Sequence, residues 1–151
     1  MESFYVVSLT NVSISAIKTL IQIAADDCPL EIIRIRLGQR SGTSIAMIPV
    51  QLRRKTVAAT VTPFTPIKLL GENQPDSHAV GGAALTGVNA SGEGTDGDIL
   101  IQGVFNSVNE WIWTPQKEKI WVPPTGIIGF KFPAAPSAAN FDCDVTFKEY
   151  Q

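Results

Sequence analysis

The sequence is dominated by short segments in which apolar and polar residues alternate. Between residues 30 and 37, Ile33, Ile35 and Leu37 alternate with Arg34 and Arg36. A period of two is typical of a β-strand with one buried face. Comparable segments lie at residues 4–9, 48–53, 57–63, 99–105, 110–113, 120–122, 126–132 and 141–150. Turn residues separate these segments, which predicts a chain of short strands.

One further segment, residues 13–25, is ambiguous from its spacing. Ile14, Ile17 and Ile21 fit a helix as well as a strand, but the β-branched content favours a strand. With this segment the chain has about nine or ten strands and no convincing helix. Short strands with frequent turns predict an all-β, single-domain fold over residues 1–151, a β-sandwich of the jelly-roll type, with a barrel as the alternative.

Residues 71–98 differ from the rest of the chain. They are rich in Gly, Ala, Ser, Thr and Asn and contain few large side chains. Such a segment cannot build a core of its own, so we expect a long loop, for which ordering against a neighbouring subunit is a natural role. His78 and Asn89 lie in this loop and are candidate interaction residues. For a lone loop histidine, however, an ordinary surface residue without a specific role is the better interpretation.

The composition argues against several classes of function. Of the 151 residues, 44% are apolar and 17% are charged, and the formal net charge is −2. The charged share is below the usual quarter, which suits either a large β core or extensive contact with a partner. No basic stripe indicates nucleic-acid binding, and Arg53-Arg54-Lys55 is interpreted as a solvated strand end. No apolar run approaches the roughly 20 residues of a membrane helix, and no signal peptide is apparent.

The sequence contains no recognisable set of catalytic residues, so we expect neither an enzyme nor a cofactor. It has no Gly-x-Ser-x-Gly elbow, His-Glu-x-x-His motif or Walker loop. Cys28 and Cys143 could meet if the terminal strands pair, but two free thiols are the favoured interpretation. Together with His78 they cannot supply a four-ligand zinc site unless carboxylates join them. The acidic run 93–98 places oxygen ligands as calcium sites do, but it lacks the EF-hand spacing and is predicted to be a turn.

Three tryptophans, Trp111, Trp113 and Trp121, fall within eleven residues. Trp111 and Trp113 share parity, so they should point to one face of a strand. Core packing or an intersubunit contact is the favoured interpretation, because tryptophan is enriched in both. The alternative is a stacking platform of the kind that carbohydrate-binding modules use. The three tryptophans, with His78 and Asn89, are therefore the candidate interaction residues.

Several short motifs follow one another along nearly the whole chain. They are the start at residues 4–14, Lys18–Gln22, Ile35–Gln39, Val50–Arg54, the small-residue loop, Trp111-x-Trp113-x-Pro115, Pro123–Gly126, Phe130–Pro133 and Phe147–Tyr150. Each motif is weak alone, and their order is what carries weight. In that order the chain resembles a family of small structural proteins of tailed bacteriophages.

The resemblance implies a jelly-roll or β-sandwich component of the virion, assembled in the host cytoplasm and without catalytic residues. It implies a decoration (cement) protein that binds the outer head surface as a homotrimer and stabilises the shell by bridging major capsid subunits. The expected partners are the major capsid protein and copies of this chain, with no nucleic acid and no membrane. The alternatives are a tail-tip, neck or fibre-associated virion protein and a carbohydrate-binding module for the host surface.

Overall fold

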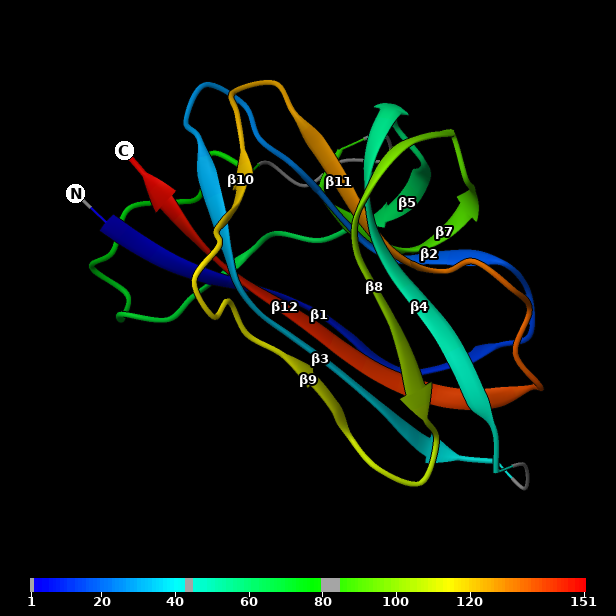
Figure 1. Ribbon diagram of the computed structural model, residues 1–151. Helices are drawn as coiled ribbons and strands as arrows, with labels where there is room; N and C mark the ends of the chain where they lie inside the picture. Colours follow the sequence, from blue (N-terminus) through cyan, green and yellow to red (C-terminus); the bar gives the residue numbers. More distant parts are fainter. Residues whose placement is uncertain (1, 43–44, 80–84) are drawn as a thin grey trace.

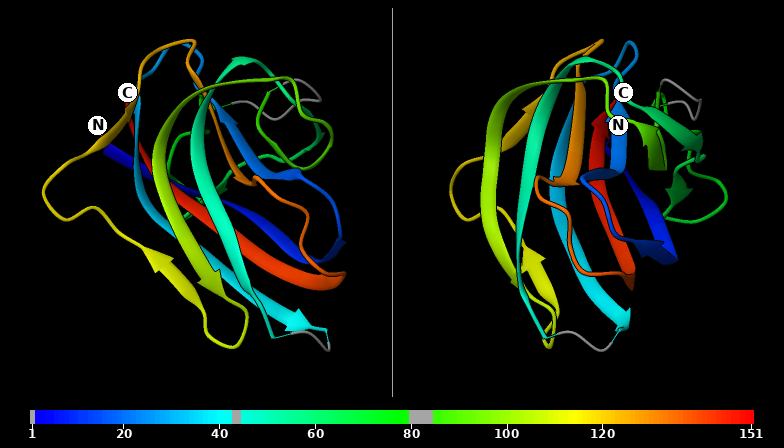
Figure 2. Two further views of the ribbon diagram at one scale, coloured as in Figure 1. Left: turned by 45° about the vertical axis from the view of Figure 1, so that its right-hand side comes forward. Right: turned by 90° about the vertical axis from the view of Figure 1, so that its right-hand side faces the viewer.

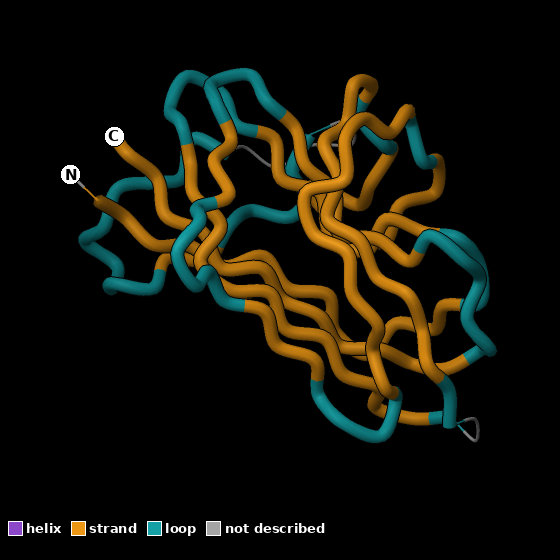
Figure 3. Tube along the Cα trace, viewed as in Figure 1, coloured by secondary structure: helices purple, strands orange, loops and turns teal. Residues whose placement is uncertain are grey.

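The computed structural model describes residues 2–42, 45–79 and 85–151, which form twelve β-strands and no helix (Figure 1 and Figure 3). The strands are β1 (Glu2–Ile14), β2 (Lys18–Ala24), β3 (Leu30–Ser41), β4 (Met47–Val57), β5 (Thr60–Pro63), β6 (Ile67–Lys68), β7 (Gly87–Gly92), β8 (Thr95–Asn106), β9 (Trp111–Trp113), β10 (Ile120–Val122), β11 (Ile127–Phe132) and β12 (Ala139–Tyr150). The expected all-β fold is confirmed, with twelve strands in place of about nine or ten.

The strands form two antiparallel sheets that pack against each other as a sandwich (Figure 2). Sheet A has the order β10-β3-β12-β1-β6, and β9 pairs with β3 further along the same edge. Sheet B has the order β5-β7-β2-β11-β4-β8. The N-terminal strand β1 and the C-terminal strand β12 are neighbours in sheet A, and their pairing runs from Glu2 opposite Tyr150 to Ile14 opposite Ala139.

Four strand pairs are nested within one another along the chain. They are β1 with β12, β2 with β11, β3 with β9 and β10, and β4 with β8. Successive pairs lie alternately in sheet A and sheet B. A nested hairpin rolled up in this way is a jelly roll. Strands β5, β6 and β7 come between β4 and β8 in the chain and extend the far edges of both sheets.

Alternate side chains from both sheets fill the interior. In β1, for example, Tyr5, Val7 and Leu9 are buried and the residues between them are only half-buried. Aromatic rings contribute much of the volume. Phe132 and Phe141, for example, are in edge-to-face contact with 5.0 Å between their ring centroids. The gap between the sheets beside Leu52 and Phe130 is too small for a water molecule. The sandwich is therefore closely packed at this point, as protein cores usually are.

Residues 13–25 are strand rather than helix, as their β-branched content predicted. A turn divides them, because β1 ends at Ile14 and β2 begins at Lys18. Ile14 and Ile21 are both buried, in different sheets, whereas Ile17 lies in the turn and is half exposed. The helix-like spacing of these three isoleucines thus arises from two strands that meet the same core.

The single long loop expected at residues 71–98 is interrupted by strands. Strand β7 and the start of β8 lie inside this range, while residues 80–84 are outside the described part of the chain. The small side chains have a packing reason here. A Cβ on Gly87 would lie 2.3 Å from the carbonyl oxygen of Thr62 in the paired strand β5. Glycine therefore permits a close approach of two strands, and composition alone does not distinguish this from a loop.

Candidate interaction sites

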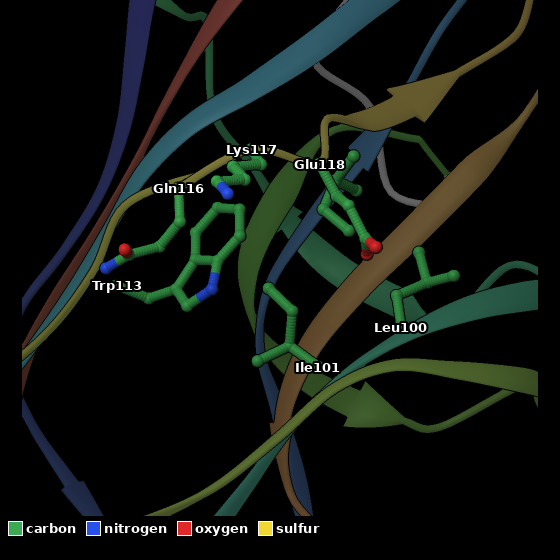
Figure 4. Close-up of a pocket in the computed structure, with 7 residues that line it drawn as sticks. Leu100, Ile101, Trp113, Gln116, Lys117 and Glu118 are labelled. Atoms are coloured by element: carbon green, nitrogen blue, oxygen red, sulfur yellow. The ribbon is translucent and has the colours of Figure 1, made fainter.

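An open cleft of about 440 Å³ lies along one side of the sandwich, where the edge strand β8 of sheet B faces β9 and β10 of sheet A (Figure 4). Its walls combine apolar side chains with a polar rim. The lining residues are Leu100 and Ile101 of β8, Trp113 of β9, Ile120 of β10, and Gln116, Lys117 and Glu118 of the connection between β9 and β10. The volume and the mixed lining are in the range of small-ligand and peptide sites. We call this feature the edge cleft.

The edge cleft exists because sheet A loses its regular edge between β9 and β10. Trp113 pairs with Ile35 and Ile120 pairs with Ile32, so residues 114–119 lie opposite only two residues of β3. The segment begins Thr114-Pro115, and proline cannot donate a ladder hydrogen bond. The chain consequently leaves the sheet after Trp113, and its excursion forms one wall of the edge cleft.

Trp111 and Trp113 share one face of β9, as their parity predicted, and that face packs against the core. The Trp111 ring stacks on Phe130 with a centroid separation of 5.6 Å and an interplanar angle of 15°. A Cβ on Gly103 of β8 would lie 3.2 Å from the same indole. Trp111 therefore closes the side of the sandwich, and only Trp113 lines the edge cleft. Both tryptophans are half-buried.

Trp121 has a different environment from the other two tryptophans. It is 41% exposed and lies against Tyr150 of β12, with 4.9 Å between ring centroids. The Lys148 ammonium stands 4.6 Å from the centre of the same tyrosine ring, a cation–π contact. The Tyr150 hydroxyl in turn donates to Glu31 at 2.6 Å. Trp121 is thus part of a polar aromatic surface on sheet A, apart from the edge cleft.

Exposed apolar side chains also lie on the edge strand β8 of sheet B and on its neighbour β4. Met47 and Val104 are 65% and 55% exposed, and Pro49 lies directly opposite Val104 on the neighbouring strand. Strand β8 is the last strand of its sheet, so one side of its backbone is not paired within sheet B. An edge of this kind with few charges can pair with another chain. We call Met47, Pro49 and Val104 the apolar edge.

Asn89, expected in a loop, lies in β7 instead. It adopts a positive φ of 51°, a conformation that asparagine tolerates better than most residues. Its side-chain oxygen accepts a hydrogen bond from the Lys18 ammonium at 2.9 Å. Both features hold the local strand geometry, so the structure gives Asn89 a packing role between β7 and β2.

His78 lies in the connection between β6 and β7 and contacts two residues of the connection between β2 and β3. Its Nδ1 atom contacts the Asp27 carboxylate and is 3.4 Å from the Cys28 sulfur. Hydrogen bonding to Asp27 raises the pKa of the His78 imidazole. Burial, followed by Asp27, raises the pKa of the Cys28 thiol, the opposite of what an activated nucleophile needs. Because sulfur and carboxylate share one ring nitrogen, the three residues do not form a Cys–His–Asp catalytic relay.

The two cysteines are both free, as the sequence predicted. Cys143 is buried in β12, whereas Cys28 is half-buried beside His78. Burial raises the pKa of the Cys143 thiol well above its usual value, so this residue is an apolar part of the core.

A cluster of paired charges on the outer face of sheet B is the feature that sequence reasoning missed. The Lys55 side chain is fully buried, and its ammonium donates to Asp96 at 2.7 Å and to the Glu93 carbonyl at 2.8 Å. Lys131 pairs with Asp96 at 2.7 Å and with Glu93 at 3.2 Å. Thr19 donates to the Glu93 carboxylate from both its amide and its hydroxyl. We call these five residues the lysine–carboxylate cluster.

The lysine–carboxylate cluster changes two interpretations of the sequence. Arg53-Arg54-Lys55 is not simply a solvated strand end, because Lys55 is a buried anchor for the turn between β7 and β8. The acidic run 93–98 directs Glu93 and Asp96 at lysines, so these carboxylates are neutralised within the chain. The turn expected over this run is confined to Glu93 and Gly94, because β8 begins at Thr95. The sequence signal that could have found the cluster is the unusual Lys131 in an otherwise apolar strand.

The described residues include no helix long and apolar enough to cross a membrane. They do include one group of three metal-ligating side chains, Asp27, Cys28 and His78. Comparison of the chain with models of protein families, with curated proteins and with solved structures found no match.

Proposed function

We propose that this chain is a non-enzymatic structural protein of a virion, a decoration (cement) protein that binds the outside of the head and bridges major capsid subunits. The observation that carries the proposal is the apolar edge. Met47 of β4 and Val104 of β8 expose apolar surface, and one side of the β8 backbone is not paired within sheet B. A residue set of this kind suits contact with another protein chain rather than chemistry on a small molecule.

Two further observations support the proposal. The jelly roll is an architecture that viral capsid domains and lectins use, although a fold alone does not define a function. The gap measured between the sheets does not admit a water molecule, so the interior does not serve as a ligand chamber there. Recognition would therefore take place on the outer surface and at the edges of the sandwich.

The size of the chain fits a small homo-oligomer. A stable interface buries about 800 Å² per partner, which is roughly a tenth of the 7309 Å² surface of this chain. The apolar edge and the edge cleft together would form the centre of such a contact, and symmetry would repeat it around a three-fold axis. Contacts that are weak singly then combine through effective concentration on the shell.

The test is binding of the purified chain to particles of the virus that encodes it. We expect co-sedimentation with heads at a copy number comparable to that of the major capsid protein, and light scattering should give a trimer. A handful of copies per particle would instead identify the tail-tip, neck or fibre alternative. A chain that stays monomeric and does not bind particles would refute the proposal.

A matched pair of variants locates the contact. Val104→Lys places a charge on the apolar edge, whereas Ile67→Lys places one on β6 at the opposite edge of sheet A, where the side chain is similarly exposed at 51%. We expect Val104→Lys to abolish trimer formation and head binding and Ile67→Lys to leave both unchanged. Loss of binding in Ile67→Lys alone would place the contact on the other side of the molecule.

A further inference from the structure

Three metal-ligating side chains from two distant segments converge at one end of the sandwich. Asp27 and Cys28 belong to the connection between β2 and β3, and His78 to the connection between β6 and β7. One ligand atom from each residue lies within 4.8 Å of the other two. The residue that precedes Cys28 supplies a carboxylate beside the cysteine and the histidine, and Cys143 lies in the core and takes no part.

One of the three separations matches that between two ligands of a tetrahedral zinc ion. Zn²⁺ binds imidazole nitrogen at about 2.0 Å and thiolate sulfur at about 2.3 Å, so two such ligands are about 3.5 Å apart. The distance from His78 Nδ1 to Cys28 Sγ is 3.4 Å. The Asp27 carboxylate contacts the same nitrogen, and its side chain is 70% exposed. Asp27 can therefore move aside by a rotamer adjustment and take a third position around a metal.

The backbone that carries His78 is fixed independently of its ring. The buried Glu149 carboxylate accepts hydrogen bonds from the backbone amides of His78 and Ala79, at 3.0 and 3.1 Å. It also accepts one from the Ser77 hydroxyl. The connection that carries Cys28 is held to the same strand end, because the amide of Tyr150 donates to the carbonyl of Pro29 at 3.1 Å. Preformed positions of this kind reduce the ordering cost of binding a ligand.

The electrostatic surroundings favour a cation at this place. Asp26, Asp27 and Glu149 all act on Cys28 and His78 through their negative charges. A cysteine, a histidine and a carboxylate together are a donor set for zinc and chemically similar divalent cations rather than for calcium or magnesium, which prefer oxygen ligands alone. The His78–Cys28 separation, the hydrogen bonds that hold the two connections and the nearby negative charges thus all favour a bound cation.

We propose that Asp27, Cys28 and His78 bind one Zn²⁺ ion per chain, with water at the fourth position. The Cys28 thiol loses its proton to solvent on binding, as thiolate ligands do. The bound ion joins the connection between β2 and β3 to the connection between β6 and β7. The site is independent of the proposed role in a virion.

The first experiment measures metal binding by tag-free protein with Zn²⁺ alone. We expect one equivalent by calorimetry and a melting temperature that rises with free Zn²⁺, because a ligand of the folded state stabilises it. Replacing Zn²⁺ by Co²⁺ should give the absorption bands of a tetrahedral cobalt–thiolate centre. No binding, or Co²⁺ spectra without a thiolate band, would overturn the proposal.

The chain contains only two cysteines and one histidine, so each proposed ligand can be replaced by itself. Cys28→Ser, His78→Gln and Asp27→Asn should each weaken Zn²⁺ binding by more than about 10-fold, since even outer-shell partners are worth about 10–100-fold. Cys143→Ala is the matched control, because Cys143 is the other thiol and lies in the core. It should bind Zn²⁺ as the unchanged chain does.

Two results would contradict the three-residue site. Unchanged affinity in both Cys28→Ser and His78→Gln would mean that the metal binds elsewhere. Loss of binding in Cys143→Ala, in protein that still shows cooperative unfolding, would mean the same. Asp27→Asn keeps the test sound if the other variants fold poorly, because the Asp27 side chain is largely exposed and its replacement removes little packing.

Discussion

Two groups of charged side chains, one on each sheet, are held in opposite ways. On sheet B, the turn between β7 and β8 covers Lys55 and Lys131, and Asp96 accepts a hydrogen bond from each of them. On sheet A, Arg36 pairs with Glu110 in a salt bridge whose two side chains are each about two-fifths exposed. The first arrangement is buried and fully paired, and the second remains in contact with water.

Sheet A also carries buried polar atoms without a partner among the described residues. They are the Ser3 hydroxyl, the Arg34 Nε atom, one oxygen of Asp144 and the Thr146 hydroxyl. Burial raises the pKa of the Asp144 carboxyl, although Arg36 and Arg34 oppose this. The comparison teaches that burial of charge is stabilising only where a covering segment brings matching partners. Charged residues at alternate strand positions look alike in sequence and differ in this respect.

The largest expected effect comes from removing the buried lysine. Lys55→Met keeps the volume but leaves the Glu93 carbonyl and one oxygen of Asp96 without their donor. Breaking a buried ion pair costs about 3–5 kcal/mol, and we expect the lower end because Lys131 still binds Asp96. Urea unfolding measures this change in the free energy of unfolding. Arg36→Met on sheet A is the control and should cost less than about 1 kcal/mol. Equal costs would remove the distinction between the two faces.

The turn that covers sheet B depends on a glycine. Gly94 has a φ of 64°, and a Cβ there would lie 2.3 Å from the carbonyl oxygen of Val57. We expect Gly94→Ala to lower stability by about 1–3 kcal/mol, the cost of a strained backbone position. Gly92→Ala, where the nearest atom to a new Cβ is 3.7 Å away, should have little effect. Thermal unfolding of the two variants provides the comparison.

The pairing on sheet B also predicts a dependence on acid. Burial raises the pKa of the Asp96 carboxyl, but hydrogen bonds from Lys131 and Lys55 outweigh it and hold the pKa below its usual value. The resulting stability is complete above the unfolded-state pKa of about 3.9 and is lost as the pH falls through the lower folded-state value. Unfolding measured between neutral pH and pH 2–3, roughly the window of these titrations, should show this loss in the native chain. Asp96→Asn should lack this component, and identical pH profiles would contradict the pairing.

The smallest effect is expected on sheet A and has the opposite sign. Thr146 is 5% exposed, and its hydroxyl has no partner among the described residues. Thr146→Val replaces an unsatisfied hydroxyl by a methyl group of similar shape, so we expect no loss of stability and a gain of up to about 1 kcal/mol. A clear destabilisation in urea unfolding would show that the hydroxyl is satisfied and that sheet A resembles sheet B.

The alternation of residues was sufficient to predict most strands and the fold class. Segments such as 30–37 and 141–150 place one apolar face toward the core whatever their partners are, because a strand repeats every two residues. The same local rule predicted that Trp111 and Trp113 share a face. It did not give the direction of that face, since whether a tryptophan points inward depends on which strand packs across from it.

The candidate sites were less predictable, because they too depend on which strands and turns pack against each other. Lys55 resembles a solvated strand end until the turn at Glu93 folds over it, and Asn89 resembles a loop residue until β7 pairs with β2. The edge cleft requires β8 and the β9–β10 connection to lie at facing edges of two sheets. His78 and Cys28 are fifty residues apart in the chain and in contact in space.

By itself the sequence determined where most strands form and that an apolar core exists. Each of these follows from local side-chain chemistry and from the period of a strand. Only the tertiary structure decided the nested order of the jelly roll, the burial of Lys55 and the meeting of Asp27, Cys28 and His78. These depend on contacts between segments far apart in the chain, whose formation reflects the packing of the whole sandwich rather than any local pattern.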